Sequence, residues 1–400
     1  MSTPAFRRST AFGAAVLLGA TALAACADSD GGGGGGDADI TAACSLENPP
    51  TSEASAPPPV DTSAQASGKV GVILPDTTSS TRYELYDAPL LTEALTNAGI
   101  EADVQNAQGD KNKFTSIAQS MIGQGVDVLI IDSIDAASGA GVEQAADEAG
   151  VDVIDYDRVN LGGSAPYYVS FDNQDVGRLQ AQTLVDCLEA QDIDKPRIIM
   201  MNGGTDVDNN AVLFAKGAHE VLDPLDEAGD IEIVSEATVK GWDVENAAPT
   251  FNQALTAAGG DVQGVLAAND DIANAVIGVL KDPGLDGHVV VTGQDASVEG
   301  LQNVITGQQS LTIFKDVTLE ATAAAQLAIA LIQGTDPADA GIVLEPFEDP
   351  EAPSHDLQAV LLPAQVITQA NVQDIIDAGA LTVDELCAGI EDDCDELGLS

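Results

Sequence analysis

The chain has 400 residues and carries 65 acidic side chains against 14 basic ones, so its formal net charge at pH 7 is −51. A surface this negative repels phosphate backbones and anionic lipid headgroups, which excludes nucleic acid and a bare lipid surface as binding partners. The length also exceeds that of a usual single-core domain, so we expect the folded part to form two lobes.

The N-terminal segment has the pattern of an export signal. Arg7 and Arg8 precede a short apolar run, and Leu23-Ala24-Ala25 stands directly before Cys26. The run is too short to span a bilayer as a mature helix, so we predict a signal peptide over residues 1–25. The pattern resembles a bacterial lipobox, which implies that Cys26 is lipidated and anchors the protein at the outer face of the cell membrane. An ordinary cleaved signal, and export by either the Sec or the twin-arginine route, stay open.

A stretch rich in Gly, Pro and Ser follows this cysteine. Residues 26–68 include six consecutive glycines and the run Pro57-Pro58-Pro59, and such a composition cannot bury a core. We therefore predict a disordered tether over residues 26–68. The glycines follow no strand and precede no Lys-Ser/Thr pair, so they do not predict a phosphate-binding loop.

The remaining cysteines are Cys44, Cys187, Cys387 and Cys394. An even number outside the cytoplasm allows two disulfides, in any of three pairings. The chain has no Cys-x-x-Cys pair and its three histidines are scattered, so we expect neither a metal nor a cofactor.

From residue 69 onward, short β-branched runs alternate with amphipathic stretches that end at glycines. Continuous apolar strands separated by helices indicate parallel sheets covered on both faces, and this many strands need two such sheets, one before about Asp172 and one after. The sequence thus predicts an α/β fold of two Rossmann-like lobes. The predicted strands cover residues 70–74, 126–131, 153–154, 168–171, 198–201, 231–234, 265–266 and 289–291.

Polar side chains stand directly after most of these strands. Because ligands of open parallel sheets meet the carboxyl ends of the strands, these positions predict a binding site. Helix capping explains about half of them. It does not explain Arg158 or Lys315, which are poor N-caps in a chain with only 14 basic residues.

An ordered set of motifs resembles the sugar-binding proteins of bacterial ABC importers, the type I periplasmic binding protein family, and most closely its xylose-binding members. The motifs stand in the family's order over residues 69–370. They are Thr81-Arg82-Tyr83, Ile154 to Arg158, Tyr168 to Asn173, Asn202-Gly203-Gly204, Asp206 to Ala211, Lys240-Gly241-Trp242, Ala268-Asn269-Asp270, Thr292 to Asp295 and Thr312 to Lys315.

The resemblance implies two lobes, joined by three crossings, that close on one monosaccharide. The N-terminal lobe would comprise residues 69–171 and 316–345, and the C-terminal lobe residues 172–315 and 346–400, with the third crossing between about Leu344 and Leu357. It further implies a monomeric, lipid-anchored binding protein that passes xylose or a similar pentose or hexose to an ABC transporter permease.

The same resemblance implies ten ligand-binding residues. Carboxylates and amides bridge sugar hydroxyls, cationic groups donate to them, and an aromatic face packs on the C–H patches of the ring. Trp242, the only tryptophan in the chain, is the expected stacking platform, with Tyr83 as the opposing wall. The ten residues are Arg82, Tyr83, Asp157, Arg158, Asp208, Asn210, Trp242, Asn269, Asp295 and Lys315.

Three of these residues are cations and three are carboxylates, which predicts an uncharged ligand. Xylose-binding relatives carry tryptophan where this chain has Tyr83 and proline where it has Asp316, so the pocket predicts a pentose or hexose in general rather than xylose alone. Three alternatives stay open. Arg158 and Asp157 could belong to a salt-bridge network, Trp242 could lie in a core, and Asn209 could take the role given to Asn210.

Other classes of function are disfavoured by missing motifs. The chain has no Gly-x-Ser-x-Gly elbow and no Walker loop, so we do not expect an enzyme, although sugar conversion stays an alternative. A calcium loop starting at Asp206 would need glycine and glutamate where Ala211 and Gly217 stand. A sugar-sensing co-receptor for chemotaxis or for a sensor kinase is a further alternative, because it would use the same fold.

Overall fold

The computed structural model describes residues 42–44, 46, 48–52, 54 and 66–399. The predicted signal peptide and the predicted lipidation site Cys26 lie outside the described residues. Within the described part, no helix combines the length and the hydrophobicity needed to cross a membrane.

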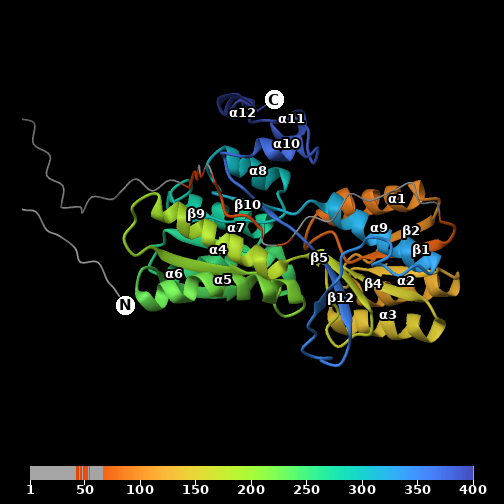
Figure 1. Cartoon of the computed structure of the whole chain (residues 1–400). Coiled ribbons are helices and arrows are strands. Elements are labelled where there is room, and N and C mark those ends of the chain that lie inside the picture. The colour runs from red at the N-terminus through yellow and green to blue at the C-terminus, as the bar shows by residue number, and fades with distance from the viewer. Residues whose placement is uncertain (1–41, 45, 47, 53, 55–65, 400) are drawn as a thin grey trace, which may run out of the picture. The chain divides into compact units, whose positions relative to one another are not determined.

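The first lobe is built on a seven-stranded sheet with the strand order β11-β12-β5-β4-β3-β1-β2, in which only β11 runs antiparallel to its neighbour (Figure 1). Helices α1 (Ala88–Asn97) and α9 (Val317–Gln333) pack together on one face, and α2 (Lys111–Gly123) and α3 (Ala136–Ala149) pack together on the other. The strands are β1 Lys69–Leu74, β2 Glu101–Asn106, β3 Val128–Ile131, β4 Asp152–Tyr156, β5 Tyr167–Phe171, β11 Glu345–Phe347 and β12 Leu357–Leu362.

The two faces of this sheet bury separate apolar clusters. Val70, Val72 and Leu74 of β1 belong to the larger cluster, while Ile73 belongs to the cluster that α2 and α3 cover. Successive side chains of a strand point to opposite faces, so a strand buried on both sides must be apolar throughout. This is why β1 after its first residue, and β3 throughout, are continuous apolar runs in the sequence.

The second lobe has a parallel sheet of order β7-β6-β8-β9 and an antiparallel pair, β10 with β13. Its strands are β6 Arg197–Asn202, β7 Glu232–Thr238, β8 Gly264–Ala267, β9 Val290–Val291, β10 Thr312–Phe314 and β13 Gln365–Ile367. Its helices are α4 Asn173–Glu189, α5 Asn209–Ala228, α6 Ala247–Ala257, α7 Asp270–Lys281, α8 Val298–Ile305, α10 Gln373–Asp377, α11 Val383–Leu386 and α12 Glu391–Leu397.

Close packing of α4 on α5 depends on two glycines. A Cβ atom added at Gly177 would lie 1.9 Å from the carbonyl oxygen of Phe214, and one added at Gly217 would lie 1.9 Å from that of Gln174. No larger residue fits at either position. The contact fixes the first turns of α5, which carry side chains of the site described below.

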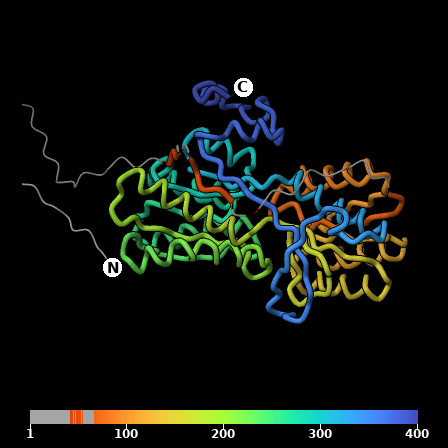
Figure 2. The backbone as a smooth tube through the Cα atoms, viewed as in Figure 1, coloured from red at the N-terminus to blue at the C-terminus, as the bar shows by residue number. Residues whose placement is uncertain are grey.

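Three crossings join the lobes within residues 66–399, as Figure 2 traces. The first lies at Asp172, between β5 and α4, and the second at Lys315-Asp316, between β10 and α9. These places coincide with the expected lobe boundaries after residues 171 and 315. The third lies at Pro363-Ala364, between β12 and β13, and not between Leu344 and Leu357.

The assignment of residues 346–362 to the second lobe was therefore wrong. Strand β12 pairs in parallel with β5, from Gln358 opposite Tyr167 to Leu362 opposite Phe171. Leu357 and Ala359 of β12 share a buried apolar cluster with Val159 and Tyr168 of the first lobe. The first lobe thus extends to residue 362 before the chain crosses for the last time.

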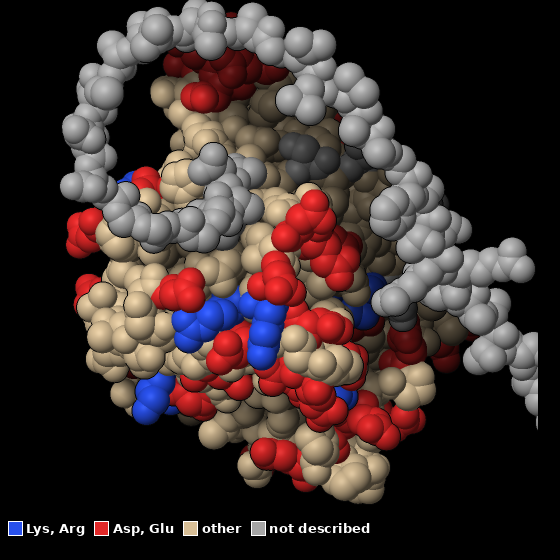
Figure 3. Space-filling model, turned by 90° about the vertical axis from the view of Figure 1, so that its left-hand side faces the viewer, with Lys and Arg blue, Asp and Glu red and all other residues tan. Residues whose placement is uncertain are grey.

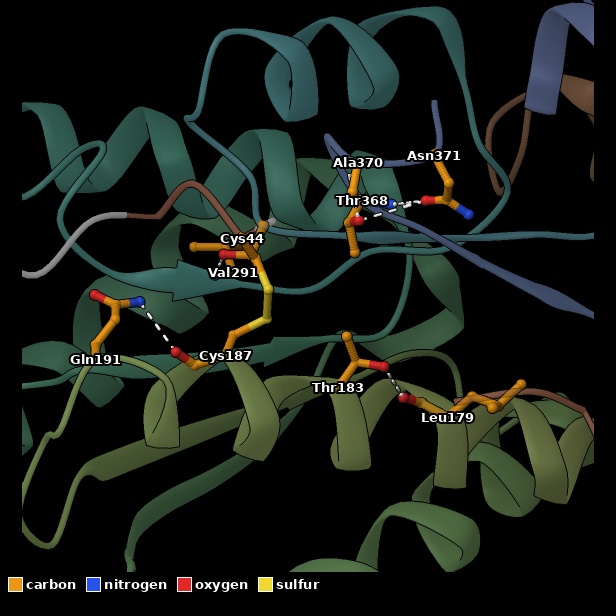
Figure 4. Close-up of a disulfide and its surroundings, with 10 residues drawn as sticks. Cys44, Leu179, Thr183, Cys187, Gln191, Val291, Thr368, Ala370 and Asn371 are labelled. Carbon is orange, nitrogen blue, oxygen red and sulfur yellow. Dashed lines mark hydrogen bonds between the residues drawn. A yellow bond between two sulfur atoms is a disulfide. The ribbon is translucent and has the colours of Figure 1, made fainter. Parts of the chain in front are cut away.

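The disulfides pair Cys44 with Cys187 and Cys387 with Cys394. The first joins the described part of the N-terminal segment to α4 (Figure 4). The amide of Ala42 donates to the carbonyl of Gly287 at 2.9 Å, and the hydroxyl of Ser52 donates to Asp175 at 2.8 Å. The prediction of a disordered tether up to residue 68 is thus wrong for the described residues between 42 and 54, which lie on the second lobe.

Candidate functional site

The ten residues singled out by the sequence line one cavity between the two lobes. Every one of them follows the carboxyl end of a strand, as the fold class predicts. Four further residues complete the lining: Ser79, Ser80, Phe214 and Gln294.

Arg82 lies at the centre of the wall formed by the first lobe. Its guanidinium donates two hydrogen bonds to the Asp87 carboxylate, at 3.0 and 2.8 Å, and a third bond to Glu320. It also lies 3.5 Å from Asp157, whose other carboxylate oxygen accepts a hydrogen bond from the Tyr83 hydroxyl at 2.8 Å. All five side chains are buried, so each charge depends on its partners for stabilisation.

Arg158 forms the second cationic group of this wall. One guanidinium nitrogen donates to the Ser79 hydroxyl at 3.0 Å and to the Tyr83 hydroxyl at 3.2 Å. The guanidinium carbons of Arg82 and Arg158 lie 5.4 and 5.6 Å from the centre of the Tyr83 ring. The Tyr83 ring therefore makes cation–π contacts with both arginines. Its role as the apolar wall opposite Trp242 stays a prediction.

Trp242 forms the wall of the second lobe that lies next to α5. Its indole nitrogen donates to Asp208 at 3.0 Å, and its ring meets the Phe214 ring edge-on at 6.4 Å. The indole packs against the backbone of Gly203 and Gly204, because a Cβ atom at Gly203 would lie 2.1 Å from a ring carbon. The two glycines of the motif Asn202-Gly203-Gly204 thus leave the space that the indole occupies.

Lys315 and Asp295 form the third charged group of the cavity. The ammonium lies 3.1 Å from the carboxylate and 5.8 Å from the ring centres of both Phe171 and Phe214. Gln294 donates a further hydrogen bond to Asp295 at 3.3 Å. Two rings and one carboxylate thus stabilise an ammonium in a largely buried position.

Three of the lining residues have left-handed backbone conformations although they are not glycine. The φ angles are 58° at Asp157, 57° at Trp242 and 91° at Asp295. Such angles are uncommon outside glycine and persist only where the surrounding contacts hold them. Their concentration around one cavity is typical of a functional site.

Several contacts bridge the two lobes across this cavity. Arg158 lies 3.6 Å from Asp208, and Ser80 donates a hydrogen bond to Asp295 at 3.5 Å. The cavity holds about 30 Å³ of free space, room for about two water-sized spheres. The lobes are therefore closed on each other, and a ligand larger than a few atoms enters only if the walls move apart.

The predicted set of three cations and three carboxylates omits three further acidic side chains. Asp87, Asp132 and Glu320 come close to the arginines from behind the cavity wall. Burial raises the pKa of Glu320 to about 8, and it raises the pKa of Asp132 well above its ordinary value. Burial alone would also raise the pKa of Asp157, but Arg82, Lys315 and Arg158 outweigh it and hold that pKa below its usual value.

Protonation of Glu320 at neutral pH thus removes part of the excess negative charge from this buried network. The network still contains five carboxyl groups, those of Asp87, Asp132, Asp157, Asp208 and Asp295, for the three cations Arg82, Arg158 and Lys315. Each cation therefore lies beside at least one carboxyl group, and the walls have no unpaired cation to offer to an anionic ligand.

The sequence contains a signal for three of the four additional lining residues, and none for the fourth. Ser79 and Ser80 directly precede the Thr81-Arg82-Tyr83 motif, and Gln294 precedes Asp295, so proximity to the motifs could have found them. Phe214 had no such signal, because it lies one turn after Asn210 inside α5.

Residues 70–336 match the family model described as a periplasmic binding protein domain. The chain is 35% identical over 271 residues to the D-xylose-binding periplasmic protein of Escherichia coli, an alignment that covers 67% of this chain and 79% of that protein. It is 33% identical over 283 residues to a multiple sugar-binding periplasmic receptor of Rhizobium radiobacter, covering 68% of this chain and 80% of that protein.

Among solved structures, the chain resembles a carbohydrate transporter solute binding protein from Chloroflexus aurantiacus in complex with D-glucose. The TM-score is 0.71 at 31% sequence identity, and the superposition covers 80% of this chain and 98% of that one.

Proposed function

The chain belongs to the periplasmic binding protein domain family, and from this premise we propose that it captures one uncharged monosaccharide outside the cytoplasm and delivers it to an ABC transporter permease. The proposal includes no catalytic step. The sugar binds between the lobes and is released chemically unchanged.

One observation carries this proposal: a single cavity between the lobes combines paired ions with an indole. Carboxylates, guanidinium groups and an ammonium can accept from and donate to ring hydroxyls, and the indole can pack against C–H groups. Because each cation is already paired with a carboxyl group, the site disfavours an anionic ligand and suits a polar one that offers hydroxyl groups.

The relatives do not favour one sugar. Their names refer to D-xylose and to multiple sugars, and the related crystal structure contains D-glucose. We therefore propose a neutral aldopentose or aldohexose, with D-xylose and D-glucose as the first candidates. Tyr83 and Asp316 are the positions at which we expect this pocket to differ from that of the xylose-binding relatives.

We also propose that the monomeric chain is held at the outer face of the membrane by a lipid on Cys26. Acidic side chains are more widespread than basic ones on the face in Figure 3, and a net charge of −51 disfavours direct adsorption to anionic lipids. A covalent lipid supplies membrane attachment that does not depend on this surface. Mass spectrometry of the mature protein, before and after Cys26→Ser, tests the modification.

A thermal-shift screen tests the sugar-binding proposal. We expect a neutral pentose or hexose to raise the melting temperature of the chain, because a ligand that binds only the folded state stabilises it by mass action. Glucose 6-phosphate and gluconate serve as charged controls and should have no effect. The absence of any shift with neutral sugars, or a larger shift with a charged control, would contradict the proposal.

A further inference from the structure

Asp270 is the first residue of α7 and directly follows the cavity residue Asn269; its side chain is buried and does not line the cavity. We propose that Asp270 is a positioning residue of the sugar site. Its carboxylate holds the turn that carries Gln294 and Asp295, and sugar affinity depends on this carboxylate being ionised. The inference rests on the proposed sugar-binding function and adds to it a residue that does not touch the sugar.

The hydrogen bonds of Asp270 reach the turn on both sides of Asp295. Its backbone amide donates to the carbonyl of Gln294 at 3.0 Å, directly before Asp295. One carboxylate oxygen accepts from the backbone amide of Ser297 at 2.8 Å, two residues after Asp295. The other oxygen accepts from the side-chain amide of Gln309 at 2.9 Å. Both oxygens thus accept from protein donors, which suits an ionised carboxyl group.

The turn needs such support, because two successive residues have left-handed backbone conformations although neither is glycine. The φ angle is 91° at Asp295 and 50° at Ala296. The amide of Ala296 donates to the Thr312 hydroxyl at 3.1 Å, and this hydroxyl is hydrogen-bonded to the Asp270 carboxylate. Loss of this support would shift the carboxylate of Asp295, which pairs with Lys315 in the cavity wall.

Two glycines leave the space that the Asp270 carboxylate occupies. A Cβ atom added at Gly293 would lie 2.1 Å from one carboxylate oxygen, and one added at Gly300 would lie 2.3 Å from the other. Gly293 directly precedes Gln294, and Gly300 lies in the first turn of α8. The carboxylate is therefore packed tightly between the two ends of the turn that it holds.

Protonation of Asp270 would weaken this set of contacts. Burial raises the pKa of Asp270 to about 7 and the charge of Asp295 adds to the rise, whereas the hydrogen bonds from Gln309, Ser297 and Thr312 oppose it. Below pH 7 the carboxyl group gains a proton, and the protonated oxygen is a poorer acceptor for its donor. We therefore expect sugar affinity to fall as the pH drops below 7, by at most about tenfold per pH unit for one proton.

The other charged groups around Asp270 are Asp295 and Lys315 of the cavity, Asp271 of α7 and Glu299 of α8. Burial raises the pKa of Asp271 to about 6, and the charges of Asp295 and Glu299 add to the rise. Asp271 thus titrates in an overlapping range, but it makes none of the described hydrogen bonds to the turn. Asp271→Asn is the matched control, because it removes the same charge one residue further along the same helix.

The first readout is calorimetric affinity for D-xylose and D-glucose from pH 7.5 to 5.5. The wild type and Asp271→Asn should bind more weakly as the pH falls. Asp270→Asn should bind about tenfold more weakly than the wild type at pH 7.5, for one lost buried hydrogen bond, and should change little with pH. A merely structural role would lower the melting temperature of Asp270→Asn without altering the pH dependence.

Three results of this series would overturn the inference. They are a wild-type affinity that does not fall, an equal fall in Asp270→Asn, and loss of the fall in Asp271→Asn. Circular dichroism establishes that each variant is folded. The wild-type series needs no variant, so it stays decisive if Asp270→Asn fails to fold.

The second readout needs no sugar. Hydrogen exchange of the Ala296 and Ser297 amides in the sugar-free chain, measured by mass spectrometry at pH 7.5, should be faster in Asp270→Asn than in the wild type and Asp271→Asn. Equal rates would overturn the inference. If the wild type binds neither sugar at any pH, the proposed function is contradicted, whereas the exchange comparison still decides whether Asp270 holds the turn.

Discussion

The indole nitrogen of Trp242 donates a hydrogen bond to the Asp208 carboxylate at 3.0 Å. The same carboxylate caps the start of α5 by accepting from the backbone amide of Asn210 at 2.8 Å, and it lies 3.6 Å from Arg158 of the opposite lobe. One buried acid thus fixes the aromatic platform, the first turn of a helix and a contact across the cleft. Loss of any of these three contacts should therefore weaken ligand binding.

Replacement of Trp242 tests the platform. We expect Trp242→Ala to weaken sugar binding by at least about 100-fold, because it removes both the aromatic face and the hydrogen bond to Asp208. Trp242→Phe keeps an aromatic face and should lose less. Calorimetry measures both, with Tyr167→Phe, outside the cavity, as the control. Unchanged affinity in Trp242→Ala would remove this residue from the site.

Gly203 offers a test that leaves every polar group in place. A Cβ atom there would lie 2.1 Å from the Trp242 ring, so Gly203→Ala must displace the indole and weaken sugar binding. Gly278→Ala is the control, because a Cβ at that position of α7 meets nothing within 4 Å. It should leave affinity unchanged and stabilise the helix by roughly 0.5–1 kcal/mol. Equal affinities in the two variants would contradict the packing described for Trp242.

The pair of Asp295 and Lys315 tests the role of matched charges. Asp295→Ala leaves the Lys315 ammonium without its carboxylate, and we expect it to lower the free energy of unfolding by about 3–5 kcal/mol and to abolish sugar binding. The double variant Asp295→Asn with Lys315→Met should regain stability without regaining binding. Urea denaturation and calorimetry separate these effects. Full binding by the double variant would contradict the assignment.

Glu320 makes stability depend on pH. Burial raises its pKa in the folded state to about 8, so the folded chain binds more protons than the unfolded chain between about pH 5 and pH 8. The contribution of Glu320 to stability is therefore present at about pH 5 and is lost as the pH rises through 8. Glu320→Gln should reduce the fall in the free energy of unfolding between pH 5 and pH 8. Parallel curves for wild type and variant, measured by urea denaturation from pH 5 to 8, would be the contrary outcome.

The two disulfides should contribute unequally. In the chain-entropy model the bond between Cys44 and Cys187, 143 residues apart, is worth about 5 kcal/mol, and the bond between Cys387 and Cys394, 7 residues apart, about 2 kcal/mol. Replacing each pair by alanine and measuring denaturation with urea tests this order. A larger loss for the shorter loop would contradict it.

The parallel sheets and the cavity lining could be predicted because both depend on local patterns. Apolar runs fix the strands, and parallel strands bring their carboxyl ends together, so residues as distant as Arg82 and Lys315 line one cavity. The place of β12 was missed because its partner β5 lies about 190 residues earlier, and no local pattern records that pairing.

Two other features had no signal in the sequence. Asp87 and Glu320 lie in helical segments without a motif, and only the fold brings them to Arg82. Cys44 lies in a segment whose composition is typical of disorder, so neither its pairing nor the contacts of Ser52 could be derived from composition.

A calorimetric titration of the wild-type chain with D-xylose and D-glucose tests the central claim most directly. The account predicts saturable binding of one sugar per chain, with the sugar recovered unchanged and no measurable binding by Asp295→Ala. Absence of binding by the wild type, turnover of the sugar, or equal affinity in Asp295→Ala would contradict it.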